Sequence, residues 1–177
     1  MAYLTTEKPS DAITTPHGLY ITMQYLSDAG GQNNYHWGLF LASDQLPRGQ
    51  LLHAARVDGQ PLDLNLEIQN VADPRRLGRI VACLQISTLK STDAIETCAK
   101  SVDVMDPNRV PTREARWTSR VWVKQVLASL NKGGHIKLPM TVDELELYCQ
   151  AAADSHLQTQ RSGDPWLHVA NDTRWCS

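Results

Sequence analysis

Three short β-rich segments joined by tight connections constrain the fold of this chain more than any other feature. Residues 19–26, 35–42 and 50–57 are rich in β-formers, and clusters of Gly, Asn, Asp and Pro separate them. Strands with such short connections pair antiparallel, because a parallel pair needs a crossover of about a dozen residues or more. We therefore expect an antiparallel meander in the first third of the chain.

Two further segments extend the expected sheet. Residues 62–68 form a weak strand candidate, and residues 79–89 carry apolar side chains at alternate positions. Together with the meander, these segments predict a curved antiparallel sheet of about five strands.

Helical patterns occupy the second half of the chain. Ser91 is placed to cap a short helix. Residues 119–131 repeat apolar side chains on one helical face and end at Gly133. Residues 141–157 open with a Thr-x-x-Glu capping box. The chain therefore predicts an α+β fold in which two main helices pack on the sheet.

The length of 177 residues fits one domain, and 42% hydrophobic residues suffice for a substantial core. Residues 1–18 are polar and contain Pro and Gly, so we expect a flexible N-terminal arm. The single α+β domain is expected over residues 19–157. Residues 158–177 are expected to form an irregular tail.

Composition also excludes several functions. A net charge of −2 with dispersed basic residues argues against nucleic-acid binding. A run of eighteen apolar residues is absent, so we expect no membrane span, and the N-terminus lacks the pattern of a signal peptide. These features favour a cytoplasmic protein. They leave the oligomeric state open.

The cysteines show no metal-binding or disulfide pattern. Their spacing contains no C-x-x-C pair, so we expect reduced, buried thiols and neither a structural metal nor a cofactor. The four positions are Cys83, Cys98, Cys149 and Cys176.

The residues with the most chemical potential lie in two strands and at one helix start. His36 stands in the segment YHWGLFL, and His53 stands in LLHAA. If these strands pair, both imidazoles emerge near one edge of the sheet. Ser119 opens the helix that would pack there, with its N-terminus directed at them. One histidine would then act as base and the other would orient it.

Each of these residues also has an ordinary structural interpretation. Serine is among the best N-cap residues, so Ser119 could serve only to cap its helix. His36 and His53 could be hydrogen-bonded core residues.

Three neighbours of this group are candidates for substrate binding. Arg120 could hold a carboxylate, or it could form a surface salt bridge. Trp37 and Trp122 could stack on a ligand, or they could pack in the core.

The order of these motifs resembles the permuted papain-like hydrolases of the lecithin:retinol acyltransferase type. It is similar also to a group of small, mostly uncharacterised fungal proteins with an HWxLxL strand and a Cys-Arg-x-Trp-Val helix. The resemblance covers roughly residues 19–140. It implies a permuted papain-like fold, with His36 as base, His53 as its partner and Ser119 at the nucleophile position. The implied chemistry is acyl transfer or amide or ester hydrolysis on a small molecule or peptide, in a fungal setting as a biosynthetic tailoring step.

The chain departs from the fungal pattern at Ser119, where that group has cysteine. A hydroxyl is much less acidic than a thiol, so the same surroundings activate it less. Three alternatives remain open: a natural variant that kept the pocket for binding only, a working serine enzyme, and a deliberate Cys-to-Ser replacement. The second-ranked function is accordingly a non-catalytic module that binds a small molecule or a protein.

Overall fold

The computed structural model describes residues 12–58, 60–89, 91–104, 106–160 and 167–173. In chain order its strands and α-helices are β1 (Gly18–Ala29), β2 (Gln32–Ala42), β3 (Gly49–Val57), β4 (Gln60–Val71), β5 (Ile80–Thr88), α1 (Thr92–Ser101), α2 (Ser119–Lys132), α3 (Val142–Thr159) and β6 (His168–Ala170).

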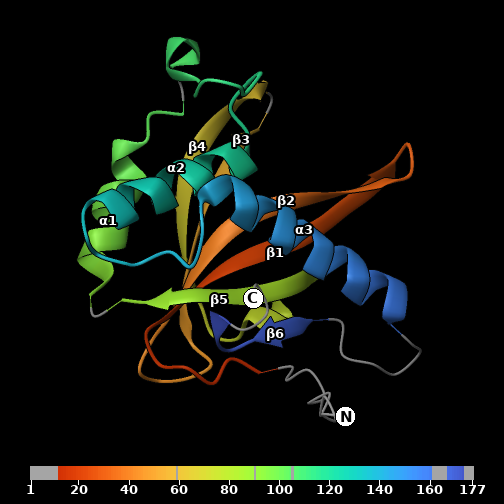
Figure 1. Cartoon of the computed structure of the whole chain (residues 1–177), viewed down its shortest axis with the longest axis vertical. Coiled ribbons are helices and arrows are strands. Elements are labelled where there is room, and N and C mark those ends of the chain that lie inside the picture. The colour runs from red at the N-terminus through yellow and green to blue at the C-terminus, as the bar shows by residue number, and fades with distance from the viewer. Residues whose placement is uncertain (1–11, 59, 90, 105, 161–166, 174–177) are drawn as a thin grey trace.

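The strands form one mixed sheet in the order β4-β3-β2-β1-β5-β6 (Figure 1). The meander β1 to β4 is antiparallel, as the short connections predicted, and β1 also pairs antiparallel with β5. The α+β class is confirmed. The expectation of about five strands, all antiparallel, was wrong, because β6 adds a sixth strand parallel to β5.

The first two strands run further into their connecting turn than predicted, and two other differences have identifiable reasons. β6 lies in the segment 158–177 that was expected to be irregular. Its three residues are too few to show an alternating pattern. β4 spans twelve residues instead of the seven in 62–68. Its exposed positions Asn65 and Glu67 are polar, and such residues weaken the β signal.

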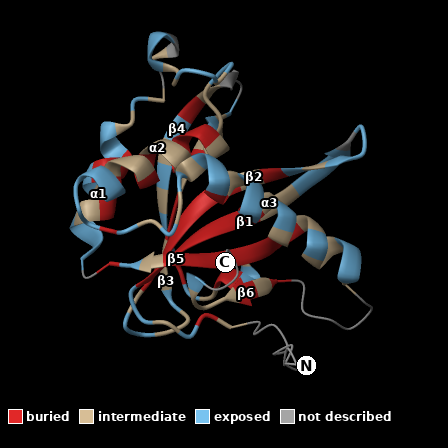
Figure 2. Ribbon diagram, in the orientation of Figure 1, coloured by how far each residue is buried: buried red, intermediate tan, exposed pale blue. Residues whose placement is uncertain are grey.

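All three α-helices pack on one face of the sheet, and the main core lies between the two layers (Figures 1 and 2). In β2 the odd-numbered residues point into this core, because successive side chains in a strand alternate between faces. The buried side chains that α2 contributes recur at helical spacing, as predicted. They are Trp122, Val123, Val126, Leu127 and Leu130.

The opposite face carries a smaller core. Phe40 and Ala42 of β2 belong to it, together with Val169 of β6. Ile13, which precedes β1, is only 4% exposed and packs in the same cluster. The described part of the segment 1–18 is therefore docked on the sheet, which corrects the expectation of a flexible arm there. Residues 1–11 of that arm lie outside the described residues.

One asparagine ties the two ends of the described chain together. Asn171 Oδ1 accepts hydrogen bonds from the Thr14 amide (2.9 Å) and the Tyr20 hydroxyl (2.8 Å). Its Nδ2 donates to the Ala12 carbonyl at 3.0 Å, and its own carbonyl accepts from Thr15 Oγ1 at 3.1 Å.

None of the helices in the described part of the chain combines the length and the apolar character needed to traverse a bilayer.

We predict that Asn171→Ala lowers the free energy of unfolding by about 2–3 kcal/mol, because it removes three side-chain hydrogen bonds and leaves the Tyr20 hydroxyl without its acceptor. Urea unfolding followed by circular dichroism measures this change. Asn65→Ala, at an exposed position of β4, is the control and should stay near wild type. Equal midpoints for the two variants would show that Asn171 does not hold the ends together.

Candidate active site

The site forms where β2 and β3 separate. Their pairing covers only the stretch from Leu39 opposite Leu52 to Ala42 opposite Gly49. Beyond it the two strands diverge, and the first turn of α2 approaches the opening (Figure 1). The amide of Trp37 has no partner on β3 and donates to Ser119 Oγ at 3.1 Å. This hydrogen bond places Ser119 beside the backbone of His36.

Ser119 does not cap its helix. Thr118 is the N-cap residue, and its side chain accepts a hydrogen bond from the Val121 amide at 3.2 Å. Ser119 therefore occupies the first helical position, which corrects the capping interpretation. Its oxygen accepts from Trp37, and its own proton is donated to no group among the described residues.

The two histidines are in direct contact. His36 Nε2 lies 2.8 Å from His53 Nδ1, a hydrogen-bond distance. The two rings stand at 89° to each other with their centroids 5.0 Å apart. The residue between His36 and Phe40 on the same face of β2 is Gly38, where the neighbouring strands leave little room for a side chain. A Cβ at Gly38 would lie 2.8 Å from Thr22 Oγ1.

A carboxylate continues the chain of contacts. Glu67 on β4 lies opposite His53 in the strand register, and its Oε2 is 3.5 Å from His53 Nε2. This contact does not have the geometry of a hydrogen bond. The buried Nε2 atom of His53 forms no hydrogen bond to any other described residue either. Gln69 Nε2 donates to the same Glu67 oxygen at 3.1 Å and fixes its position. Glu67 was not among the residues predicted from the sequence. Its place beside His53 becomes evident only from the register between β3 and β4.

These contacts favour one arrangement of protons. An ionised Glu67 can only accept, so the proton of a neutral His53 belongs on Nε2. His53 Nδ1 is then an acceptor, and His36 donates to it from Nε2. The remaining nitrogen of His36, Nδ1, carries a free lone pair. Glu67, His53 and His36 thus lie in one series of contacts, and the hydrogen bond to His53 holds the His36 ring in place.

His36 and Ser119 line the same cleft, whose volume is about 350 Å³. His53 does not line the cleft itself, but it contacts the cleft residue His36 through a hydrogen bond. No hydrogen bond joins Ser119 to either imidazole in the described part of the chain. The lining residues are Leu26, Ser27, Asn34, Tyr35, His36, Ala54, Arg56, Leu64, Arg116, Trp117, Thr118 and Ser119.

Burial keeps the histidine pair uncharged. The pKa of His36 is lowered to about 4 by burial first and then by His53 and Arg56. Burial also lowers the pKa of His53, and the nearby Glu67 carboxylate only partly opposes this shift. Both imidazoles are therefore neutral at about pH 7.

The three residues proposed for substrate binding lie elsewhere. Arg120 is paired with Glu114 at 2.5 Å and with Glu146 at 2.7 Å, and it does not line the cleft. Trp37 is 3% exposed and Trp122 is fully buried, so both pack in the core. The tryptophan that does line the cleft is Trp117, which the sequence analysis passed over.

Arg120 belongs to an ion-pair cluster that holds the segment before α2. Lys124 contacts Glu114 at 3.0 Å and both Asp143 and Glu146 at 2.7 Å. Burial lowers the pKa of Lys124, but hydrogen bonds to these carboxylates outweigh it and raise the pKa overall. The cluster thereby anchors Glu114, three residues before the cleft-lining Trp117.

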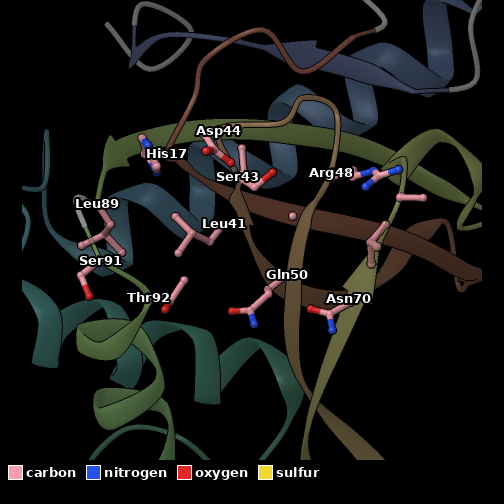
Figure 3. Close-up of a pocket in the computed structure, with 14 residues that line it drawn as sticks. His17, Leu41, Ser43, Asp44, Arg48, Gln50, Asn70, Leu89, Ser91 and Thr92 are labelled. Atoms are coloured by element: carbon pink, nitrogen blue, oxygen red, sulfur yellow. The ribbon is translucent and has the colours of Figure 1, made fainter.

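A larger hollow of about 760 Å³ lies at the other end of β2 (Figure 3). It contains Ser43, Asp44 and His17, residue types that could form a catalytic group. No hydrogen bond joins these side chains among the described residues. The smaller cleft is therefore the better candidate, because Ser119 and His36 both line it and His36 is hydrogen-bonded to His53.

The described residues contain no cluster of three or more His, Cys, Asp or Glu side chains suited to hold a metal ion. Cys83, Cys98 and Cys149 are buried, and none of them forms a disulfide within the described part of the chain. Cys176 lies outside the described residues.

We predict that His36 makes the protein lose stability as the pH falls. An unfolded chain protonates histidine near about pH 6.5. In the folded protein the pKa of His36 is about 4, so between these values the unfolded state binds more protons and the free energy of unfolding decreases. His36→Gln should reduce this slope by up to about 1.4 kcal/mol per pH unit.

Urea unfolding at several pH values between about 5 and 7 measures the slope. His135→Gln, at an exposed position, is the control and should leave it unchanged. A His36→Gln slope identical to that of wild type would mean that the imidazole is not held neutral.

Comparison with curated proteins gives no match, and comparison with solved structures gives none either. A family model described as a family of unknown function, DUF6540, matches residues 23–137. This range is more than half of the 177-residue chain and contains His36, His53, Glu67 and Ser119. The chain therefore belongs to the DUF6540 family.

Proposed function

We propose that this protein is an enzyme of the acyl-transfer class, acting by amide or ester hydrolysis or by acyl transfer on a small molecule or peptide. One observation carries the proposal. The Ser119 hydroxyl, which does not cap its helix, lines one cleft with His36, and Nε2 of His36 is hydrogen-bonded to His53. A nucleophile, a base and an orienting partner are the components that such chemistry requires.

The proposed reaction has two halves. Ser119 Oγ attacks the acyl carbon, and its proton passes to Nδ1 of His36. The first-turn amides of Ser119 and Arg120, which lack intrahelical acceptors, stabilise the oxyanion. His36 then gives the proton to the leaving group as the acyl–leaving-group bond breaks. Water or a second nucleophile releases the acyl group from Ser119 in the reverse sequence.

The same geometry also favours the second candidate, a binding protein without turnover. An imidazole whose pKa is about 4 is a weak acceptor for the proton of a serine hydroxyl. A thiol would ionise far more readily in this position. Slow or absent turnover with intact ligand binding is the expected behaviour of this alternative.

The permuted papain-like relationship is part of the proposal, and the order of His36, His53 and Ser119 along the chain supports it. A role as a biosynthetic tailoring enzyme of a fungus follows from the same resemblance, whereas the proposed cytoplasmic location rests on the sequence pattern alone. The relationship to papain-like enzymes is tested most directly by restoring the cysteine of the similar fungal proteins.

We predict that Ser119→Cys creates a thiol that reacts with iodoacetamide about tenfold faster or more than an ordinary exposed thiol. Its position at the first residue of α2, beside His36, lowers its pKa. Mass spectrometry of the labelled peptide distinguishes it from the buried Cys83, Cys98 and Cys149.

Thr92→Cys is the matched control, because Thr92 is the exposed first residue of α1 and is not among the residues of the cleft. Adding His36→Ala to Ser119→Cys should remove the enhanced rate. Equal labelling at positions 119 and 92, unaffected by His36→Ala, would rule out an activated nucleophile. Rapid labelling without turnover of esters or amides would favour the binding protein.

We predict that Glu67→Gln slows the labelling of Ser119→Cys by about three- to tenfold. The substitution removes the negative charge that lies 3.5 Å from His53 Nε2 and favours a proton there, so it weakens the preference for the tautomer in which His36 donates to His53. Asp63→Asn on the same strand is the control. An unchanged rate in Glu67→Gln would show that Glu67 has no effect on the histidine pair.

A further inference from the structure

We propose that the cleft at Ser119 takes an acyl compound bearing a carboxylate or phosphate group, which Arg56 and Arg116 bind. The inference rests on the proposed function for the reaction, and on the charges of the cleft for the class of substrate.

The charges that line the cleft are of one sign. Arg56 comes from β3 and Arg116 from the segment before α2, so the two guanidinium groups belong to different walls. The lining includes no aspartate and no glutamate. A concave site with basic groups alone concentrates anions, and guanidinium groups bind planar oxyanions in a bidentate manner.

Three carboxylates that contact the cleft residues or His53, or lie close to them in the chain, are engaged with other partners. Glu114 is bound by Arg120 and Lys124. Asp154 accepts hydrogen bonds from the Tyr35 hydroxyl and from Asn33 Nδ2, and Glu67 accepts from Gln69. Among the described residues, neither Arg56 nor Arg116 forms an ion pair. Their charge is thus available to a ligand.

Both arginines are close to the reacting groups. Arg56 lies near enough to His36 to lower the pKa of that imidazole. Arg116 precedes Ser119 by three residues and lines the same cleft. If the anionic group of a substrate is held between the two arginines, its acyl carbon must lie only a few atoms along the substrate from that group to reach Ser119. An anion there would also offset the effect of Arg56, so it should raise the pKa of His36 and strengthen it as a base.

The rest of the lining limits the size of the substrate. A volume of about 350 Å³ lies at the lower end of the range for small-molecule sites. Leu26, Ala54, Leu64 and Trp117 supply a small apolar wall. The cleft therefore suits a short acyl chain with one anionic end.

The test uses the full chain with three probes of similar size: N-acetylglycine for a carboxylate, methyl phosphate for a phosphate, and N-acetylglycinamide as the neutral control. NMR titration follows the imidazole signals of His36 and gives the dissociation constants. We expect at least one anion to bind about tenfold or more tightly than the neutral amide. We also expect that anion to raise the pKa of His36 from its free value. The tighter of the two anions identifies the group.

Arg56→Gln and Arg116→Gln should each weaken anion binding by about tenfold. Arg48→Gln, which lies at the larger hollow, is the matched control and should not change it. Anions that bind no better than the amide, or binding that both cleft variants leave unchanged, would overturn the inference.

The same experiment separates this inference from the proposed function. Anion binding that depends on both arginines, in a protein whose Ser119→Cys thiol is not activated, would keep the inference and reject the enzyme. An activated thiol without arginine-dependent anion binding would keep the proposed enzyme and reject the anion-binding inference.

Discussion

The divergence of β2 from β3 is the constraint on which the site depends. Paired strands satisfy each other's backbone groups, so an amide that loses its neighbour needs another acceptor. The Trp37 amide finds it in the Ser119 hydroxyl at 3.1 Å. This hydrogen bond joins the start of α2 to the sheet at Trp37, the residue that follows His36. The cleft is therefore a consequence of how the sheet opens.

Alternation along the strands explains both what the sequence predicted and what it missed. The periodicity of β2 and of α2 predicted their buried faces correctly, because burial of one face leaves a strong pattern. Pairing partners leave no such pattern. Glu67 meets His53 only because β3 and β4 adopt one particular register. The short strand β6 was likewise invisible, since three residues show no period.

The start of α2 depends on which of two adjacent hydroxyl residues caps the helix. Thr118 and Ser119 are both good N-cap residues, and sequence alone does not choose between them. The structure assigns the cap to Thr118, which leaves the Ser119 oxygen to the Trp37 amide. Arg120 turns away toward Glu114 and Glu146, where Lys124 completes the cluster. The residues before and after Ser119 thus have structural partners, whereas the proton of the Ser119 hydroxyl has no acceptor among the described residues.

The histidine pair shows what the site gains and loses by burial. Removing two imidazoles from water keeps both neutral and gives His36 a defined orientation through His53 and Glu67. The cost is basicity, because burial and the charge of Arg56 both depress the pKa of His36. A buried base of this kind matches a thiol better than a hydroxyl, since a thiol gives up its proton more readily. A negatively charged ligand at Arg56 would oppose the loss of basicity, so in this arrangement substrate charge and base strength would rise together.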